Sequence, residues 1–187
     1  MPAIRLSLRC SDSSRAGSPD GAPAVWQVAA GLSAYSPLFI HSKHIHPMIS
    51  YNTINVRMPA ISRRQVSAWV RAVARRYARR VGEVAYVFCD DEKILEVNRQ
   101  YLQHDYYTDI ITFDYCEGEV IAGDLIISLD TVRSNAEQLG KDYDEELHRV
   151  IIHGVLHLCG IDDKGPGERE IMEAAEDEAL AMLRQTD

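Results

Sequence analysis

Two histidines stand four residues apart inside an apolar stretch, HGVLHLCGIDD, that covers residues 153–163. On a helix, residues i and i+4 lie on one face about one turn apart, so the imidazoles of His153 and His157 can point at a single metal ion. Gly160 permits a sharp reversal of the chain, and Asp163 follows soon after it. Because catalytic zinc takes three protein ligands and one water, these side chains predict a hydrolytic metal centre.

The spacing H-x-x-x-H-x-x-G-x-x-D copies the metzincin protease pattern H-E-x-x-H-x-x-G-x-x-H with two substitutions. Asp163 replaces the last histidine and reduces the positive charge of the site, so a less acidic metal-bound water is expected. Gly154 replaces the glutamate that acts as general base in zinc proteases, so a conventional protease mechanism lacks its proton acceptor. The alternative interpretation is two core histidines beside a solvated acidic turn. Asp162 is either a residue of that turn or a partner that orients the site.

Hydrophobic periodicity and turn residues place this motif in a domain of mixed secondary structure. The helix that carries the histidines is apolar nearly all round, so we expect it to be the central and most buried helix. Helices and a small mixed sheet without regular strand–helix alternation indicate an α+β fold. The pattern predicts strands over residues 49–56, 83–89, 109–115 and 124–129, a hairpin loop over 116–123, and helices over 62–80, 91–101, 131–139, 142–159 and 168–183.

The composition is that of a globular protein with an uneven charge distribution. The 187 residues suffice for one domain with a buried core, and no stretch is apolar enough to span a bilayer, so we expect no membrane association. The four cysteines form no C-x-x-C pair, which indicates a reducing compartment, and we expect the protein in the cytoplasm. The formal net charge is −8, which argues against a protein that simply coats nucleic acid. Seven arginines nevertheless gather over residues 63–80, as a solvated helix face or as a track for phosphates.

Three stretches, HGVLHLCGIDD, EVNRQYLQHDYYTDIITFDY and AGDLIISL, resemble the YbeY family of zinc-dependent endoribonucleases. The family pattern is approximately L-N-x-x-Y-R-x-x-D-x-x-T-D-V-L-S-F, then G-D-I, then H-G-x-L-H-L-x-G-Y-D-H, and the resemblance runs from about Met48 to Leu183. It implies a zincin-like single domain, with a small mixed sheet and helices packed around a central metal-binding helix. It also implies one zinc ion per chain and no small-molecule cofactor.

The resemblance further implies a biological role. A member of this family is expected to cleave single-stranded RNA at the 3′ end of 16S ribosomal RNA and to act in small-subunit ribosome biogenesis and quality control. The expected partners are ribosomal RNA and the small ribosomal subunit, with its proteins or an assembly GTPase.

Two positions depart from the family pattern. Asp163 stands where the family has its third histidine, and carboxylates bind zinc at similar distances, so metal binding is expected to survive. Leu102 stands where the family has an arginine that is thought to hold phosphate near the metal. Arg99 lies one turn back on the same helix face and is the candidate replacement, with a surface cation as the alternative.

The sequence therefore gives a defined set of candidate residues. We assign the metal to His153, His157 and Asp163, and the catalytic roles to His153 and Arg99. Three further residues match the family motifs and are expected to fix structure rather than to do chemistry: Thr108, Asp109 and Asp124.

Residues 1–47 differ from the rest of the chain. They are rich in Ser, Gly, Pro and Ala without a sustained period, so we expect them to be disordered or loosely structured. A targeting leader is one explanation, and a genuine start at Met48 is the one we favour. The domain prediction is thus an N-terminal extension over 1–47 and a YbeY-like hydrolase domain over 48–187. Histidines at positions 41, 44 and 46 are either weak metal ligands or chance residues.

Two other functions fit the same residues. A metalloprotease or other hydrolase on this scaffold is disfavoured by Gly154, and incubation with casein and with single-stranded RNA separates it from a nuclease. A non-catalytic ribosome-assembly factor with a structural zinc is favoured by the acidic charge, which from Met48 onward is −10, with 16 basic and 26 acidic residues. Replacement of His157 by alanine then leaves ribosomal RNA maturation intact, whereas a nuclease loses it.

Overall fold

The structure is a computed structural model, and it describes residues 6–9, 48–102 and 107–185. The strands are β1 (Leu6–Arg9), β2 (Met48–Thr53), β3 (Arg80–Cys89), β4 (Ile110–Asp114) and β5 (Val120–Ser128). The helices are α2 (Arg63–Arg76), α3 (Asp91–Val97), the π-helical segment η1 (Asn98–Leu102), α4 (Leu129–Leu139), α5 (Tyr143–Leu158) and α6 (Glu168–Arg184).

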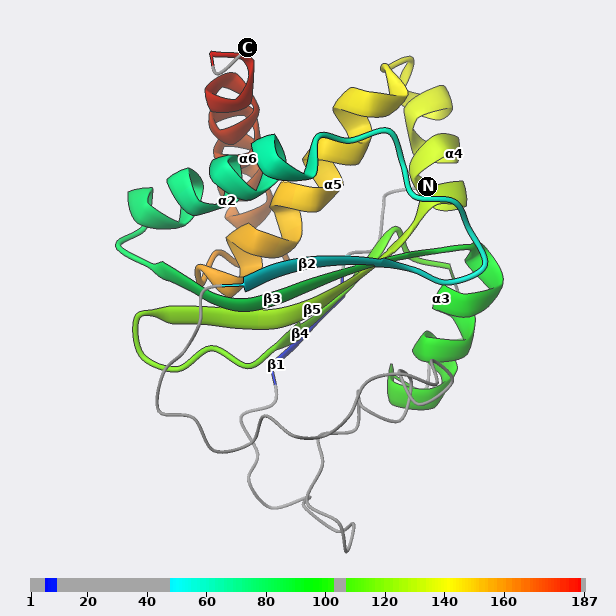
Figure 1. Cartoon of the computed structure of the whole chain (residues 1–187), viewed down its shortest axis with the longest axis horizontal. Helices are drawn as coiled ribbons and strands as arrows, with labels where there is room; N and C mark the ends of the chain where they lie inside the picture. Colours follow the sequence, from blue (N-terminus) through cyan, green and yellow to red (C-terminus); the bar gives the residue numbers. More distant parts are fainter. Residues whose placement is uncertain (1–5, 10–47, 103–106, 186–187) are drawn as a thin grey trace, which may run out of the picture. The chain divides into compact units, whose positions relative to one another are not determined.

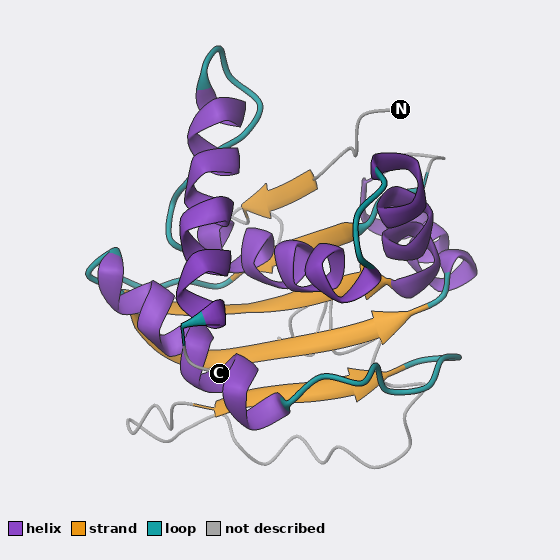
Figure 2. Ribbon diagram, turned by 90° about the horizontal axis from the view of Figure 1, so that it is seen from above, coloured by secondary structure: helices purple, strands orange, loops and turns teal. Residues whose placement is uncertain are grey.

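The strands form one mixed sheet in the order β1-β4-β5-β3-β2. The pairs β2–β3, β3–β5 and β1–β4 are parallel, and β4 pairs antiparallel with β5. Helices α2, α5 and α6 lie together on one face of the sheet (Figure 1), and α5 packs over β4 and β5. The view from above in Figure 2 shows several of the helices lying across the strands. This arrangement confirms the predicted α+β fold.

Helix α5 is the central helix, and its second half is buried on every side. It begins where the Asp142 Oδ1 atom accepts hydrogen bonds from the backbone N–H groups of Asp144 and Glu145, at 2.9 and 3.4 Å. Every residue over 150–158 is buried. Gly160 has a φ of +98°, the left-handed conformation that glycine adopts without strain, and it ends the helix with a sharp turn. The predicted helix over 142–159 and its glycine terminus are thus confirmed.

Gly154 is a point of close approach between α5 and the sheet. A Cβ atom there would lie 2.6 Å from Leu125 Cδ2, 2.8 Å from Ile110 Cδ1 and 3.2 Å from Thr112 Oγ1. Leu125 and Ile110 are themselves buried in the core, so an added Cβ atom requires both side chains to shift within close-packed surroundings. The missing side chain at this position therefore sets how closely the histidine-bearing helix sits on the sheet.

Helix α6 is joined to the other helices by a buried hydrogen bond. The Trp69 Nε1 atom on α2 donates to the backbone oxygen of Ala179 on α6 at 2.7 Å. Helix α6 also packs against α5. These contacts fix the position of the last helix, whose buried side chains reach the functional site.

Several predicted boundaries differ from those in the structure. Helix α2 ends at Arg76 instead of residue 80, because Ala78 has a φ of +54° and the chain turns there into β3. Strand β5 begins at Val120 instead of residue 124, so the turn at Gly118, with a φ of +58°, is shorter than the predicted hairpin loop. The predicted helix over 91–101 divides into α3 and η1, and the first predicted strand ends at Thr53.

The N-terminal extension lies largely outside the described residues. Residues 1–5 and 10–47, which include the three histidines of the extension, are not described, and Leu6–Arg9 form β1. The division of the chain at Met48 stays a prediction. None of the helices in the described part of the chain combines the length and hydrophobicity that a bilayer-spanning segment requires.

Candidate metal centre

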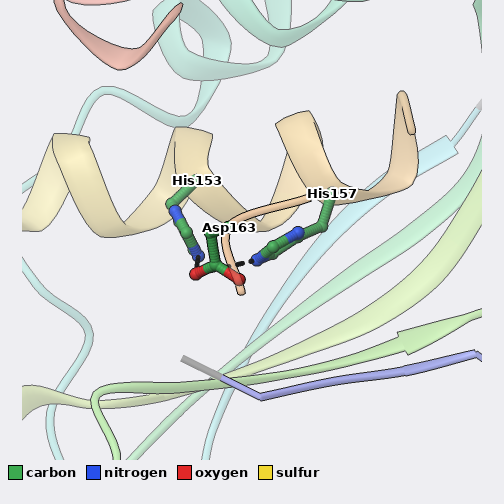
Figure 3. A group of neighbouring side chains, drawn as sticks. All are labelled: His153, His157 and Asp163. Carbon is green, nitrogen blue, oxygen red and sulfur yellow. Dashed lines mark ion pairs between the residues drawn. The ribbon is translucent and has the colours of Figure 1, made fainter. Parts of the chain in front are cut away.

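His153 and His157 lie one turn apart on α5, and Asp163 reaches them from the loop that follows the helix (Figure 3). The Asp163 Oδ2 atom lies 3.8 Å from the Nε2 atom of each histidine. One ligand atom from each of the three residues lies within 4.8 Å of the others. Both imidazoles are buried, whereas the Asp163 side chain is 14% exposed and forms the solvent side of the group. The structure thus brings together the three residues that the sequence assigns to a metal.

This group of atoms fits a divalent transition metal such as zinc. Two imidazole nitrogens and one carboxylate oxygen are ligands that zinc takes in catalytic sites. Tetrahedral bonds of about 2.0–2.2 Å set ligand atoms roughly 3.3–3.6 Å apart. The observed 3.8 Å is slightly wider, and it is too long for a hydrogen bond between the carboxylate and either ring. The three groups thus converge without a hydrogen bond between the carboxylate and either ring, and they would hold a divalent ion between them.

The Nδ1 atom of each histidine has a partner that orients the ring. Nδ1 of His153 lies 2.8 Å from Oε1 of Glu176, and Nδ1 of His157 lies 2.8 Å from the backbone oxygen of Ile161. A carboxylate and a carbonyl oxygen both accept hydrogen bonds, so this geometry favours the tautomer with the proton on Nδ1 of each ring. In that tautomer each Nε2 lone pair faces the centre of the group, as a metal at Nε2 requires.

Glu176 is the functional residue that the sequence analysis missed. The sequence predicts an acidic amphipathic helix over residues 168–183, and Glu176 was one acid among many. In α6 its side chain is 1% exposed, and a carboxylate is rarely buried unless it has a partner. The sequence signal that could have identified Glu176 is its position among the apolar residues on one face of this helix. The buried residues of that face are Met172, Ala175, Glu176, Ala179, Leu180 and Leu183.

The other candidate residues have different surroundings. Arg99 is an exposed residue of η1, and Asp162 is exposed in the loop before Asp163. Thr108 and Asp109 are 1% exposed. Asn98 donates a hydrogen bond to Thr108 at 3.1 Å, and Asn135 donates one to Asp109 at 3.4 Å, which supports a structural role for both.

A cysteine also lies close to the loop, immediately after α5. Burial raises the pKa of the Cys159 thiol to about 12. The thiol of Cys159 is therefore protonated at neutral pH in the metal-free protein.

A protein-family model described as endoribonuclease YbeY matches residues 51–184 of this sequence. The chain belongs to this family. The match includes all three residues of the candidate metal centre and confirms the resemblance that the three sequence motifs indicated.

Relatives from the YbeY family match over almost their whole length. The chain is 72% identical to endoribonuclease YbeY of Phocaeicola vulgatus over 136 residues, which make up 73% of this chain and 99% of the relative. It is 69% identical to endoribonuclease YbeY of Bacteroides thetaiotaomicron over 134 residues, 72% of this chain and 98% of the relative. The solution structure of TM1509 from Thermotoga maritima covers 74% of this chain and 93% of its own, with a TM-score of 0.53 and 23% identity, and it shares the fold.

Asp124 lies within the region that matches the YbeY family, and it is a half-buried carboxyl on β5. Burial raises the pKa of Asp124 from 3.8 to about 6, although the Tyr115 hydroxyl donates a hydrogen bond to it at 3.3 Å. The folded protein therefore holds this proton more tightly than the unfolded chain does. As a result, the contribution of Asp124 to the free energy of unfolding is fully present below about pH 4. This contribution is lost as the pH rises to about 6, because the carboxyl then ionises in the folded protein.

We expect Asp124→Asn to remove this dependence on pH. Relative to the natural protein, the variant should be equally stable near pH 4 and more stable by about 1–3 kcal/mol at pH 7. Urea unfolding of both proteins between pH 4 and pH 8 measures the difference, with Glu170→Gln, which changes an exposed carboxyl of α6, as the control. Stability curves that run parallel over this range would contradict the prediction.

Proposed function

We propose that this protein is a zinc-dependent endoribonuclease that cleaves single-stranded RNA during the maturation of ribosomal RNA. The observation that carries the proposal is the convergence of His153, His157 and Asp163, at 3.8 Å, in a chain of the endoribonuclease YbeY family. A zinc ion bound by these residues supplies Lewis acidity toward water and toward a phosphate oxygen.

The residues around the ion have distinct roles in this proposal. His153 and His157 hold the ion through Nε2 from a buried helical turn, which excludes bulk water from one side. Asp163 adds a negative charge on the solvent side, where an RNA strand approaches. Arg99 is the proposed cation for the phosphate, in place of the arginine that the family pattern has at Leu102.

The arginines that follow Ser62 contribute in part to protein structure. Arg71 donates to the backbone oxygen of Ser67, Arg79 donates to that of Gly118, and Arg76 forms an ion pair with Glu178. The other arginines of residues 63–80 are exposed, and their positive charges are available to bind phosphates: Arg63, Arg64, Arg75 and Arg80. A phosphate track in this proposal consists of these four residues.

The packing of Gly154 favours a nuclease over a protease. The position that carries the general base in zinc proteases here meets Leu125 and Ile110 at less than 3 Å from an added Cβ. A carboxylate has no room there.

The proposed setting is the cytoplasm, on the small ribosomal subunit and the 3′ end of 16S ribosomal RNA. Because the chain is acidic, a ribosomal protein or an assembly GTPase is the proposed means of delivery.

Metal analysis beside a cleavage assay tests the proposal. Purified wild type should contain about one zinc per chain and cut a single-stranded RNA oligonucleotide, and it should leave casein intact. Asp163→Ala should lose most of the metal and reduce RNA cleavage by at least about 100-fold, because only two ligands remain. Glu170→Ala, which removes an exposed carboxyl of α6, is the control and should match the wild type.

Two results would count against this proposal in different ways. Cleavage of casein but not of RNA by the wild type would favour a protease. Full metal content and full RNA cleavage in Asp163→Ala would remove Asp163 from the ligand set.

A further inference from the structure

A buried charge network lies behind His153, on the side away from Asp163. The Nδ1 atom of His153 lies 2.8 Å from Oε1 of Glu176, and the other oxygen of Glu176, Oε2, accepts a hydrogen bond from Nη1 of Arg149 at 3.1 Å. The side chain of Glu176 is 1% exposed and that of Arg149 is 12% exposed. Each oxygen of one buried carboxylate thus has its own partner, a candidate metal ligand on one side and a guanidinium on the other.

Arg149 is itself held in place by further acids. Its Nη1 atom lies 2.8 Å from Oδ1 of Asp177, its Nη2 atom 3.9 Å from Glu145, and its Nε atom 4.0 Å from Glu146. A guanidinium has donors and no acceptor, so the group facing it must accept. The hydrogen bond from Nη1 of Arg149 to Oε2 therefore holds the Glu176 carboxylate in place, and its other oxygen, Oε1, faces His153.

We propose that Glu176 is a positioning residue that holds His153 in the Nδ1–H tautomer, and that Arg149 holds Glu176 in the orientation this requires. The inference rests on the metal centre of the proposed function. In the opposite tautomer, a ring lone pair would face a buried carboxylate oxygen at 2.8 Å, which is repulsive. The proton would then sit on Nε2, the atom that faces His157 and Asp163, and it would block a metal ion.

The network predicts an unusual effect for the substitution Glu176→Gln, which has nearly the same shape. A glutamine has one acceptor oxygen and one donor nitrogen in place of two acceptors. The amide oxygen then accepts the hydrogen bond from Arg149, because a guanidinium facing an amide N–H₂ group would place donors against donors. The N–H₂ group then faces Nδ1 of His153 and donates to it, so the ring proton moves to Nε2.

Nitrogen NMR of the histidine side chains tests this inference without any metal. In metal-free, full-length protein with ¹⁵N-labelled histidine, His153 should be Nδ1–H in the wild type and Nε2–H in Glu176→Gln. A His153→Gln variant assigns the signal. In a competition with a chromophoric chelator, Zn²⁺ should bind the variant about 10–100-fold more weakly than the wild type. Glu178→Gln is the matched control, because its carboxylate on the same helix pairs with Arg76, and it should keep the wild-type tautomer and affinity.

Each result decides the inference. An Nε2–H tautomer of His153 in the wild type overturns it, whatever the variant does and whether or not the variant folds. The same tautomer and the same Zn²⁺ affinity in Glu176→Gln and the wild type also overturn it. A wild type that binds no Zn²⁺ defeats the proposed metal centre instead, and the tautomers, which are measured without metal, still report on Glu176. Arg149→Lys keeps a donor toward Glu176 and should preserve the Nδ1–H tautomer.

Discussion

Replacement of His157 by alanine should abolish both zinc binding and RNA cleavage. The Nε2 atom of His157 lies 3.8 Å from the Asp163 carboxylate, and its Nδ1 is fixed by the backbone oxygen of Ile161, so the ring is already oriented for a metal. Loss of a partner that merely orients a ligand costs 10–100-fold in metal affinity or activity. Loss of the ligand itself should therefore reduce cleavage by more than about 100-fold. Metal analysis and cleavage of a single-stranded RNA on the same preparation measure both effects.

His148→Ala is the matched control for this substitution. His148 lies on the same helix, packs edge-on against Trp69, and is bonded through Nδ1 to the backbone oxygen of Asp144. Its loss should leave metal content and cleavage unchanged. In cells, the folded His157→Ala protein should fail to support ribosomal RNA maturation. Normal maturation with this variant would favour an assembly factor whose metal is structural.

Gly154→Glu should prevent stable folding. The first added carbon would already lie 2.6 Å from Leu125 and 2.8 Å from Ile110, and the rest of the side chain would bring a charge into an apolar core. We expect a loss of more than about 4 kcal/mol, a large share of the 5–15 kcal/mol that stabilises a typical domain. Denaturant unfolding followed by circular dichroism measures this loss.

A graded series separates the contact from the charge. Gly154→Ala adds only the clashing carbon, and it should cost about 1–3 kcal/mol despite the better helix propensity of alanine. Ala174→Glu introduces the same charge at an exposed position of α6 and should change stability by less than about 0.5 kcal/mol. A stable Gly154→Glu protein that hydrolyses casein would show that the position accepts a general base after all.

The sequence was sufficient to predict that His153, His157 and Asp163 converge, because every part of that signal is local. The i, i+4 spacing places both histidines on one face of α5, and Gly160 turns the chain so that Asp163 returns toward them.

Tertiary contacts account for what the sequence did not reveal. Glu176 meets His153 across a sequence separation of 23 residues, and no spacing rule connects an acid of α6 with a histidine of α5. Gly154 looked like a lost catalytic residue, and the packing against Leu125 gives the physical reason for it. The start of β5 was missed because Val120 pairs with Arg80 on a strand distant in sequence, and the turn residues around Gly118 concealed the extended backbone.

The contact between α6 and His153 has a consequence for the order of assembly. Glu176 follows His153 by 23 residues in the chain, so its carboxylate meets the imidazole only once α6 has packed against α5. A protein shortened before α6 would keep both histidines on one helix and would lack the acceptor that orients the ring of His153.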